Sequence, residues 1–456
     1  MPTASFRALL LGGALSLTAP ALAQAPTDAG EATPAPDASG PADTLPTADA
    51  APDAAPEPPA KTTDILSADT LTLLVDGRFV LADGGKSFVD GGLGKTRFDG
   101  NRNGDLVGKL IPVEADLIWS PRFTSTLSGN VSAAWQRDQE NPVDLIEAFV
   151  TWLPERGRIG VSAKAGLYWP EISLEHATGG AWSTVNTITP SAINSWVGEE
   201  TKVVGGEVSL YASAGQHDFN ATVGVFGLND TSGTLLSFRG WALHDIKATA
   251  FGHFELPPLN PFIRLLQENR TRSTIDLDNR PGFYGRLEWR PPWPFSINVF
   301  YYDNRGNPEA FNPTNQWGWR TRFLNVGLSA DLGAGTRLLA QGMVGTTQMG
   351  FKENGVPWVD TYYRSAYVLL THDFGKFALT GRAEAFGTHE RESEMSPENG
   401  EDGAAFTLAA RAPITNRLTG FVEALHVRSS RGTRVDIGLP AFEAQTVAQA
   451  ALRFRW

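Results

Sequence analysis

The chain has 456 residues, no cysteine and a formal net charge of −12. The lack of cysteine excludes thiol catalysis and cysteine-ligated metal centres, and the acidic balance gives no indication of a nucleic-acid partner. No stretch beyond the first segment approaches the roughly 18 consecutive apolar residues of a transmembrane helix. Composition alone would therefore describe an exported soluble protein, and only the residue pattern changes that view.

Residues 1–23 carry the three regions of a secretory signal peptide. Arg7 supplies the positive charge, residues 8–17 are apolar, and Ala21-Leu22-Ala23 forms a cleavage site before Gln24. We predict that this segment is removed after export.

Residues 24–64 are rich in Ala, Pro and Asp and contain few large apolar side chains. Such a segment buries too little surface to offset its ordering entropy. We predict a disordered periplasmic tether, which is either an inert spacer or a contact to the cell wall.

From residue 65 to residue 456 the chain alternates apolar and polar residues in runs of about ten. In 122–136, for example, Leu127 and Val131 share one face while Ser128 and Ser132 share the other. About ten residues is the length that a tilted membrane strand needs, whereas soluble strands average five or six. The pattern predicts an all-β fold, a transmembrane antiparallel β-barrel.

Sixteen strands are predicted, an even number that lets both chain ends lie on the periplasmic side. Eighteen is the alternative, because the long loop 229–282 has room for two more. The predicted strands lie near 70–83, 110–120, 122–136, 143–153, 157–169, 200–213, 217–228, 283–291, 294–303, 317–332, 336–350, 364–374, 376–388, 404–413, 417–429 and 445–456.

The connections between these strands alternate short and long, as the periplasmic turns and external loops of outer-membrane barrels do. The predicted long loops are 84–109, 170–199, 229–282, 351–363, 389–403 and 430–444. Aromatic residues are expected to form the two interfacial girdles. We assign Trp119, Trp152, Trp289, Trp293 and Trp456 to the short-turn end, and Trp135, Trp169 and Tyr301 to the long-loop end.

The chain ends in Ala451-Leu452-Arg453-Phe454-Arg455-Trp456, which resembles the C-terminal signal that delivers outer-membrane barrels to their assembly machinery. The position of loop 170–199 is similar to that of the constriction loop in trimeric porins. Residues 164–170, together with Pro190 to Glu200, resemble the corresponding region of phosphate-selective porin-like proteins. The resemblance implies a homotrimeric diffusion pore of a Gram-negative outer membrane, in contact with the lipid bilayer and lipopolysaccharide.

Strand phase predicts which charged side chains line the pore. These are Asp76, Arg78, Glu114, Asp116, Glu147, Lys164, Glu207, Arg286, Glu288, Arg290, Arg382, Glu384, Arg453 and Arg455. Acids dominate the strands at 110–120, 143–153 and 200–213, and arginines dominate four others. Opposed walls of this kind would create a field across the pore. Mutual pairing of the same charges is the alternative. General porins place arginines beside the constriction loop where this chain has acids, so the ion preference stays open.

The candidate constriction loop 170–199 and its flank contribute further charged and aromatic residues. These are Glu171, Glu175, His176, Trp182, Trp196, Glu199 and Glu200. The aromatic side chains could contact sugars or bases, but we favour the interpretation that they anchor the loop to the barrel wall.

Residues 99–105 match the opening of a calcium loop, with oxygen ligands at Asp99, Asn101, Asn103 and Asp105. The match fails at its twelfth position, which Leu110 occupies. We interpret the segment as a polar surface loop, with weak Ca²⁺ binding as the alternative, and expect no other cofactor.

The sequence therefore predicts a passive porin for small hydrophilic solutes, integral to the outer membrane, and no enzyme. Two alternatives stay open: a surface or tethering barrel with a plugged lumen, and an outer-membrane hydrolase. A hydrolase would need a nucleophile, a base and an orienting group close together. The seven histidines are scattered, and no nucleophile elbow is present.

Overall fold

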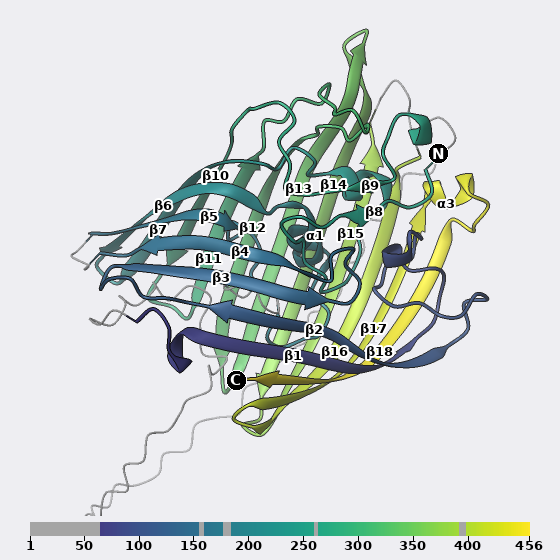
Figure 1. Cartoon of the computed structure of the whole chain (residues 1–456). Coiled ribbons are helices and arrows are strands. Elements are labelled where there is room, and N and C mark those ends of the chain that lie inside the picture. Colours follow the sequence, from purple (N-terminus) through teal and green to yellow (C-terminus); the bar gives the residue numbers. More distant parts are fainter. Residues whose placement is uncertain (1–63, 155–158, 177–183, 260–262, 392–397) are drawn as a thin grey trace, which may run out of the picture. The chain divides into compact units, whose positions relative to one another are not determined.

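The computed structural model describes residues 64–154, 159–176, 184–259, 263–391 and 398–456 (Figure 1). The predicted signal peptide and most of the predicted tether lie outside these residues. Within the described residues, no helix is long and apolar enough to cross a membrane.

One antiparallel sheet of sixteen strands closes on itself, which confirms the predicted barrel. Closure joins β1 to β18, with Asp76 opposite Arg453, so the sheet has no free edge. The barrel strands are β1 (Leu71–Ala82), β2 (Val107–Trp119), β3 (Leu127–Gln136), β4 (Val143–Trp152), β5 (Ile159–Tyr168), β6 (Val203–Ala214), β7 (His217–Gly227), β10 (Gly282–Arg290), β11 (Phe295–Asp303), β12 (Arg320–Gly333), β13 (Thr336–Glu353), β14 (Val356–Asp373), β15 (Ala378–Glu390), β16 (Glu401–Thr415), β17 (Leu418–Arg431) and β18 (Phe442–Arg455).

The alternative of eighteen strands is wrong. In the described part of the long segment between β7 and β10, the added strands are β8 (Phe254–Glu255) and β9 (Arg270–Thr271), which form a separate two-stranded sheet. The same segment holds the short helix α2 (Thr234–Phe238). Two further helices are α1 (Ala192–Glu200) before β6 and α3 (Gly432–Asp436) before β18, and three 3-10 turns lie at Ala68–Thr70, Phe88–Asp90 and Ile263–Leu265.

The prediction of a long loop at 351–363 is also wrong, because β13 and β14 continue into a tight hairpin. Asn354 and Gly355 both have positive φ, 53° and 86°. Asn-Gly is the preferred pair for a two-residue hairpin whose twist matches that of its strands. The resulting hairpin projects beyond the neighbouring strands in Figure 1.

The strand predicted to begin at residue 122 starts at Leu127 instead. The hydroxyl of Thr124 accepts hydrogen bonds from the backbone N–H of Thr126 and Leu127, and Phe123 N–H donates to the Leu127 carbonyl. This local turn competes with the strand ladder. The Thr124 hydroxyl accepts the hydrogen bonds of these backbone N–H groups, which therefore need no partner strand.

The barrel exterior carries a broad apolar surface. Its exposed side chains include Val75, Leu117, Val208, Leu287, Val326, Val368, Leu408 and Val422. Trp152, Trp293 and Trp456 are exposed at the short-turn end, as predicted for that girdle. Trp169 is not a girdle residue, because β5 ends at Tyr168 and the chain then turns inward, leaving Trp169 only 2% exposed. A closed barrel with this exterior is suited to lipid contact.

Candidate functional site: the barrel interior

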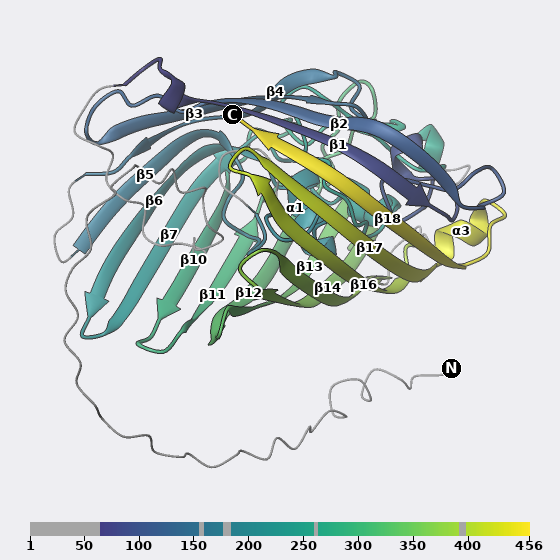
Figure 2. The same cartoon turned by 90° about the horizontal axis from the view of Figure 1, so that it is seen from below.

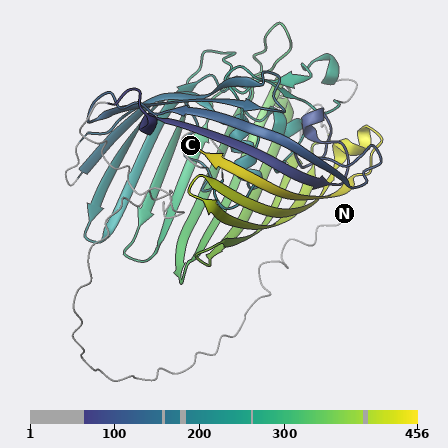
Figure 3. The ribbon, with the colours of Figure 1, turned by 60° about the horizontal axis from the view of Figure 1, so that its bottom comes forward.

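Two long connections fold into the barrel. Every residue of α1 is buried, and so is every residue from Asn229 to Ala250. Figure 2 views the ring of strands from below and Figure 3 from an intermediate angle, and in Figure 2 α1 lies inside the ring. Inward-facing strand residues and these two segments together form the largest hydrophobic cluster of the protein.

Trp196 of α1 is the centre of this cluster. Its ring lies 5.4 Å from the Phe323 ring of β12 and 5.3 Å from the Tyr363 ring of β14. Trp241, from the second inserted segment, packs edge-on against it and donates a hydrogen bond to the Gly387 carbonyl of β15. Contacts of Trp196 and Trp241 with the strands β12, β14 and β15 therefore hold α1 in place.

The first inserted segment is the connection between β5 and β6, which contains α1. Charged side chains of the barrel wall form hydrogen bonds with its backbone. Arg382 of β15 donates to the carbonyls of Thr189 and Pro190 and lies 2.8 Å from Glu384 and 3.2 Å from Glu175. We call Glu175, Arg382, Glu384 and Glu423 the latch.

The carboxylates of the latch accept the backbone N–H groups of the same segment. Glu423 of β17 accepts from Ile188 and Thr189, and Glu384 accepts from Ala192. Side chains of β15 and β17 thus form hydrogen bonds with backbone groups of residues 188–192. A buried loop requires such partners, because unpaired backbone polar groups are costly away from water.

A second network ties the other inserted segment to the closure of the barrel. Arg78 of β1 lies 2.8 Å from Asp76 and also pairs with Asp245, which is 3.0 Å from Arg97. Arg453 of β18 completes it at 3.0 Å from Asp76. The predicted pore-lining residues Asp76, Arg78 and Arg453 are therefore partners of a loop as well as of one another.

Two adjacent glutamates of α1 lie in opposite electrostatic environments. Arg239 contacts Glu199 at 2.6 and 2.7 Å, and His244 Nε2 lies 2.9 Å away. Burial alone would raise the pKa of Glu199, but Arg239 and His244 lower it to about 2. Glu200 instead accepts N–H groups from Trp196, Gly233 and Leu235, and burial raises its pKa to about 7.

This difference predicts a pH dependence that Glu200→Gln should remove. The folded-state pKa of Glu200 exceeds its ordinary 4.5, so the native state binds the proton more tightly and stability falls as pH rises from about 4.5 to 7. The expected total change is about 3 kcal/mol. Unfolding midpoints of wild type and variant at pH 5 and 8 measure it. Glu199 does not interfere, because its stabilisation is lost only as pH falls from about 4.5 towards 2. An equal pH slope in both proteins would contradict the prediction.

The inward faces of β5, β6 and β10 carry several partly accessible charges, and we call these faces the open wall. Lys164 lies 2.9 Å from Glu207, and the two side chains are 11% and 10% exposed. Arg290 is 28% exposed and pairs with Glu288. Glu171 follows β5, is 44% exposed and lies 3.6 Å from Arg286.

The predicted pore-lining residues all occupy inward-facing strand positions, with Arg455 exposed at the end of β18. The structure pairs many of these charges with an opposite charge on the same strand, on the next strand or on an inserted segment. Glu114 is 3.0 Å from Lys247, and Asp116 and Glu147 are buried beside the inserted segments. The segregated charge walls expected from the sequence are thus replaced by local pairs, because neighbouring strands place opposite charges within contact distance.

The other predicted site residues are less closely grouped. The His176 ring is tilted against the Trp169 ring, with centroids 5.3 Å apart, and Trp182 lies outside the described residues. In the candidate calcium loop, Asn101 Oδ1 accepts the N–H groups of Asn103 and Asp105, and Asp99 accepts from Ser87. These oxygens already have protein partners, and Ca²⁺ binding stays a prediction.

The sequence analysis missed a group of three aspartates whose carboxylates lie close enough to bind a cation together. Asp230, Asp276 and Asp278 each place one carboxylate oxygen within 4.8 Å of the others. All three accept backbone N–H groups of residues 277–280 or 307. The latch residue Glu423 was also missed, although its position in the alternation of β17 marks it as inward-facing.

No protein-family model and no curated protein sequence matches the chain. Solved structures do. The outer membrane channel DcaP of Acinetobacter baumannii matches with a TM-score of 0.53 at 9% identity, covering 87% of this chain and 100% of that one. The chain has the fold of an outer-membrane porin.

Two other solved structures are similar at lower scores. The anion-selective porin from Comamonas acidovorans has a TM-score of 0.48 at 12% identity, over 85% of this chain and 99% of that one. OmpT, an outer membrane protein of Vibrio cholerae, has a TM-score of 0.45 at 9% identity, over 86% and 99%. The porin fold and the apolar exterior together agree with the predicted integral outer-membrane location.

Proposed function

We propose that the protein is a passive diffusion channel of restricted aperture for small hydrophilic solutes. The observation that carries this proposal is the open wall, which presents accessible, polar side chains to the interior of a closed barrel. In a pore, selectivity follows from the charges along the path and from whatever narrows it. Here α1 and residues 229–250 occupy space that would otherwise be water, so any path past the open wall is narrow.

A surface or tethering barrel with a plugged lumen is the second candidate. Complete burial of α1 and of residues 229–250, together with the latch, favours it, because a filled barrel is a stable anchor without being a channel. A hydrolase has less support, since histidines that a catalytic group would need have other contacts. His244 lies against Glu199 and Phe88, and His217 stacks on Trp289.

Planar-bilayer recording of the refolded mature protein separates the two candidates. We expect stable conductance steps smaller than those of an unobstructed sixteen-stranded barrel. Under a salt gradient the reversal potential should be close to zero, because the accessible interior charges are paired and their fields largely cancel. Folded protein that gives no steps would exclude the channel and leave the plugged barrel. A large reversal potential would show that one sign of charge controls the path.

We further propose the assembly that the sequence resemblance implies. The apolar face of β18 ends in Leu452, Phe454 and Trp456, all exposed, which suits recognition by the barrel-assembly machinery. A homotrimer is the proposed oligomer, and cross-linking in native membranes would test it.

A further inference from the structure

One ion pair of the open wall is partly accessible and is fixed from behind. The register places Lys164 of β5 opposite Glu207 of β6, and Lys164 Nζ lies 2.9 Å from Glu207 Oε1. The hydroxyl of Tyr284 in β10 donates a hydrogen bond to the other oxygen of this carboxylate, and it lies 3.0 Å from the Tyr168 hydroxyl. Both oxygens of Glu207 therefore have a partner, which holds the carboxylate in one orientation.

A glycine makes this arrangement possible. Gly224 of β7 is the register partner of both Glu207 and Tyr284, so it lies between them in the sheet. A Cβ at Gly224 would overlap the Tyr284 ring, which lies across β7 and reaches Glu207. The position of Glu207 is thus set by three neighbouring strands, and such preorganisation lowers the cost of binding a ligand.

The lumen side of this ion pair keeps hydrogen-bonding capacity. An ammonium group has three N–H donors, and a carboxylate has about four acceptor sites. Within the described residues, Glu207 is the one acceptor that Lys164 contacts, and the rings of Tyr168 and Phe149 flank the ammonium at 4.4 and 5.6 Å. The Lys164 and Glu207 side chains are 11% and 10% exposed. Donors of Lys164 and lone pairs of Glu207 are therefore available to water or to a solute.

Water has access to this part of the wall. Glu171, which follows the end of β5, is 44% exposed and lies 3.6 Å from Arg286 of β10. Arg286 is the next inward-facing residue after Tyr284 on that strand. A solute that moves past Glu171 therefore comes close to the Lys164–Glu207 pair.

We propose that Lys164 and Glu207 form a selectivity site for zwitterionic solutes whose ammonium and carboxylate groups are about 3 Å apart, as they are in α-amino acids. The solute carboxylate accepts from Lys164, and the solute ammonium donates to Glu207. A simple anion that is attracted by Lys164 is repelled by Glu207, because the two charged groups are only 2.9 Å apart, and a simple cation meets the opposite conflict. A solute with both charges at this spacing gains both attractions. This inference rests on the proposed channel function and names its solute class.

The site is suited to passage and not to retention. A channel site must attract the solute and still let it leave. A solute at this site competes with the existing contact between Lys164 and Glu207, which keeps its binding weak.

Osmotic swelling of proteoliposomes that contain the refolded mature protein tests the site. The probes are α-aminobutyrate and γ-aminobutyrate, which are isomers with the same mass and net charge, and erythritol, a neutral solute of similar size. Of the two isomers, the α-isomer has the charge spacing of the Lys164–Glu207 pair. We expect wild type to admit it about fivefold faster than the γ-isomer, because its two charge-assisted hydrogen bonds form together. Erythritol entry measures the open path by itself.

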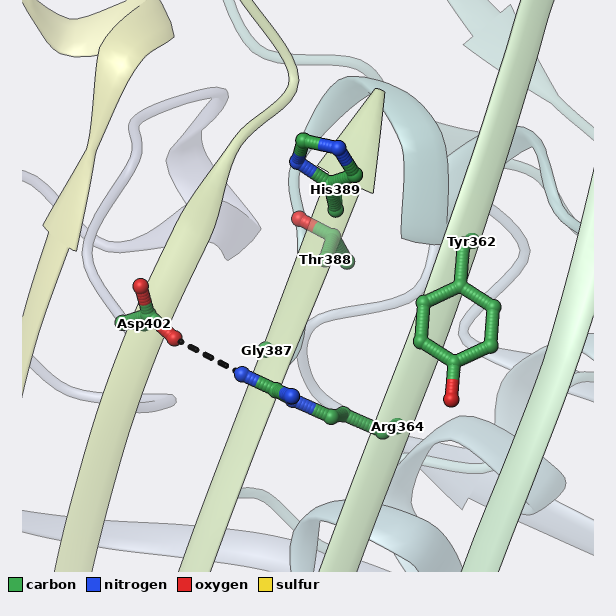
Figure 4. Close-up of a pocket in the computed structure, with 6 residues that line it drawn as sticks. All are labelled: Tyr362, Arg364, Gly387, Thr388, His389 and Asp402. Carbon is green, nitrogen blue, oxygen red and sulfur yellow. Dashed lines mark hydrogen bonds and ion pairs between the residues drawn. The ribbon is translucent and has the colours of Figure 1, made fainter. Parts of the chain in front are cut away.

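The variant Lys164→Gln/Glu207→Gln removes both charges and keeps polar side chains of similar length. It should admit the two isomers equally, while erythritol entry stays at the wild-type rate. The matched control is Arg364→Gln/Asp402→Asn, because this ion pair, 3.4 Å apart, lies on the outer wall with side chains that are 45% and 80% exposed. Figure 4 shows Arg364 extending across the strand at Gly387 towards Asp402. The control should keep the wild-type preference for the α-isomer.

The reversed pair Lys164→Glu/Glu207→Lys gives an independent sign. A solute can turn round, so this variant should still prefer the α-isomer, whereas a merely structural role of the two native residues predicts no preference.

Equal entry of the two isomers into wild-type proteoliposomes that admit erythritol would overturn the inference and leave the channel function intact. A preserved preference in Lys164→Gln/Glu207→Gln would overturn it as well. Wild-type protein that admits no erythritol would overturn the channel function and the inference together. If a variant does not show the heat-modifiable gel mobility of a folded barrel, the wild-type comparison of the isomers decides.

Discussion

Arg382→Gln is expected to destabilise the barrel and to widen the path through it. The substitution removes the donor to the Thr189 and Pro190 carbonyls and leaves Glu175 and Glu384 buried without their common cation. Breaking a buried ion pair from one side costs about 3–5 kcal/mol. We expect the free energy of unfolding to fall by that amount and the single-channel conductance to rise, because the backbone at Thr189 and Pro190 loses the hydrogen bonds that Arg382 donates to it.

A second variant separates loss of the latch from general damage. Adding Glu175→Gln and Glu384→Gln to Arg382→Gln removes the unpaired acids and should restore part of the stability, while the conductance stays raised. Arg417→Gln, an exposed turn residue, should change neither quantity. Wild-type conductance in Arg382→Gln, from a barrel shown to be less stable, would mean that the first inserted segment does not narrow the path.

Trp196→Ala is expected to have an effect on stability of similar size for a different reason. Trp196 is 1% exposed, packs against Phe323, Tyr363 and Trp241, and donates to Glu200 at 2.7 Å. Truncation leaves a cavity at the centre of the largest hydrophobic cluster and should cost about 3–5 kcal/mol. Denaturant unfolding in detergent measures the loss.

Trp293→Ala provides the matched control for this prediction. It is the same exchange at a residue that is 58% exposed on the outer surface, where no enclosed cavity is left, and its cost should be smaller. Trp196→Phe keeps most of the ring contacts and should fall between wild type and Trp196→Ala. Equal losses for Trp196→Ala and Trp293→Ala would show that α1 contributes little to the stability of the barrel.

Both predictions concern a barrel interior that is filled by inserted segments. Filling changes the environment of the interior charges from water to close-packed partners. In an open pore, acidic and basic walls would face each other across water. Here Arg382, Asp76 and Glu114 are each paired within contact distance with a residue of a neighbouring strand or of an inserted segment. Their main effect is to satisfy buried backbone and side chains, and the accessible charges that remain lie along the open wall.

The sequence alone determined the barrel and favoured sixteen strands, with eighteen left open until the closed sheet was seen. On every strand, alternation with a period of two sets which side chains face inward. Because the exterior contacts lipid, the outward positions of all strands must be apolar, so the signal accumulates over the chain. Arg382 and Glu384 could be placed on the inner face for this reason. The pair Asn354-Gly355 is a local signal that is also readable from sequence, and overlooking it explains the wrong prediction of a loop at 351–363.

Only the tertiary structure decided what fills the barrel. Residues 229–250 have no period that distinguishes an external loop from an inserted one, because their burial depends on partners far along the chain, such as Gly387 for Trp241 and Arg78 for Asp245. The pairing of the interior charges was hidden for the same reason. Alternation fixes the face on which a side chain lies, but the register between strands, which places Lys164 opposite Glu207, is a property of the closed sheet.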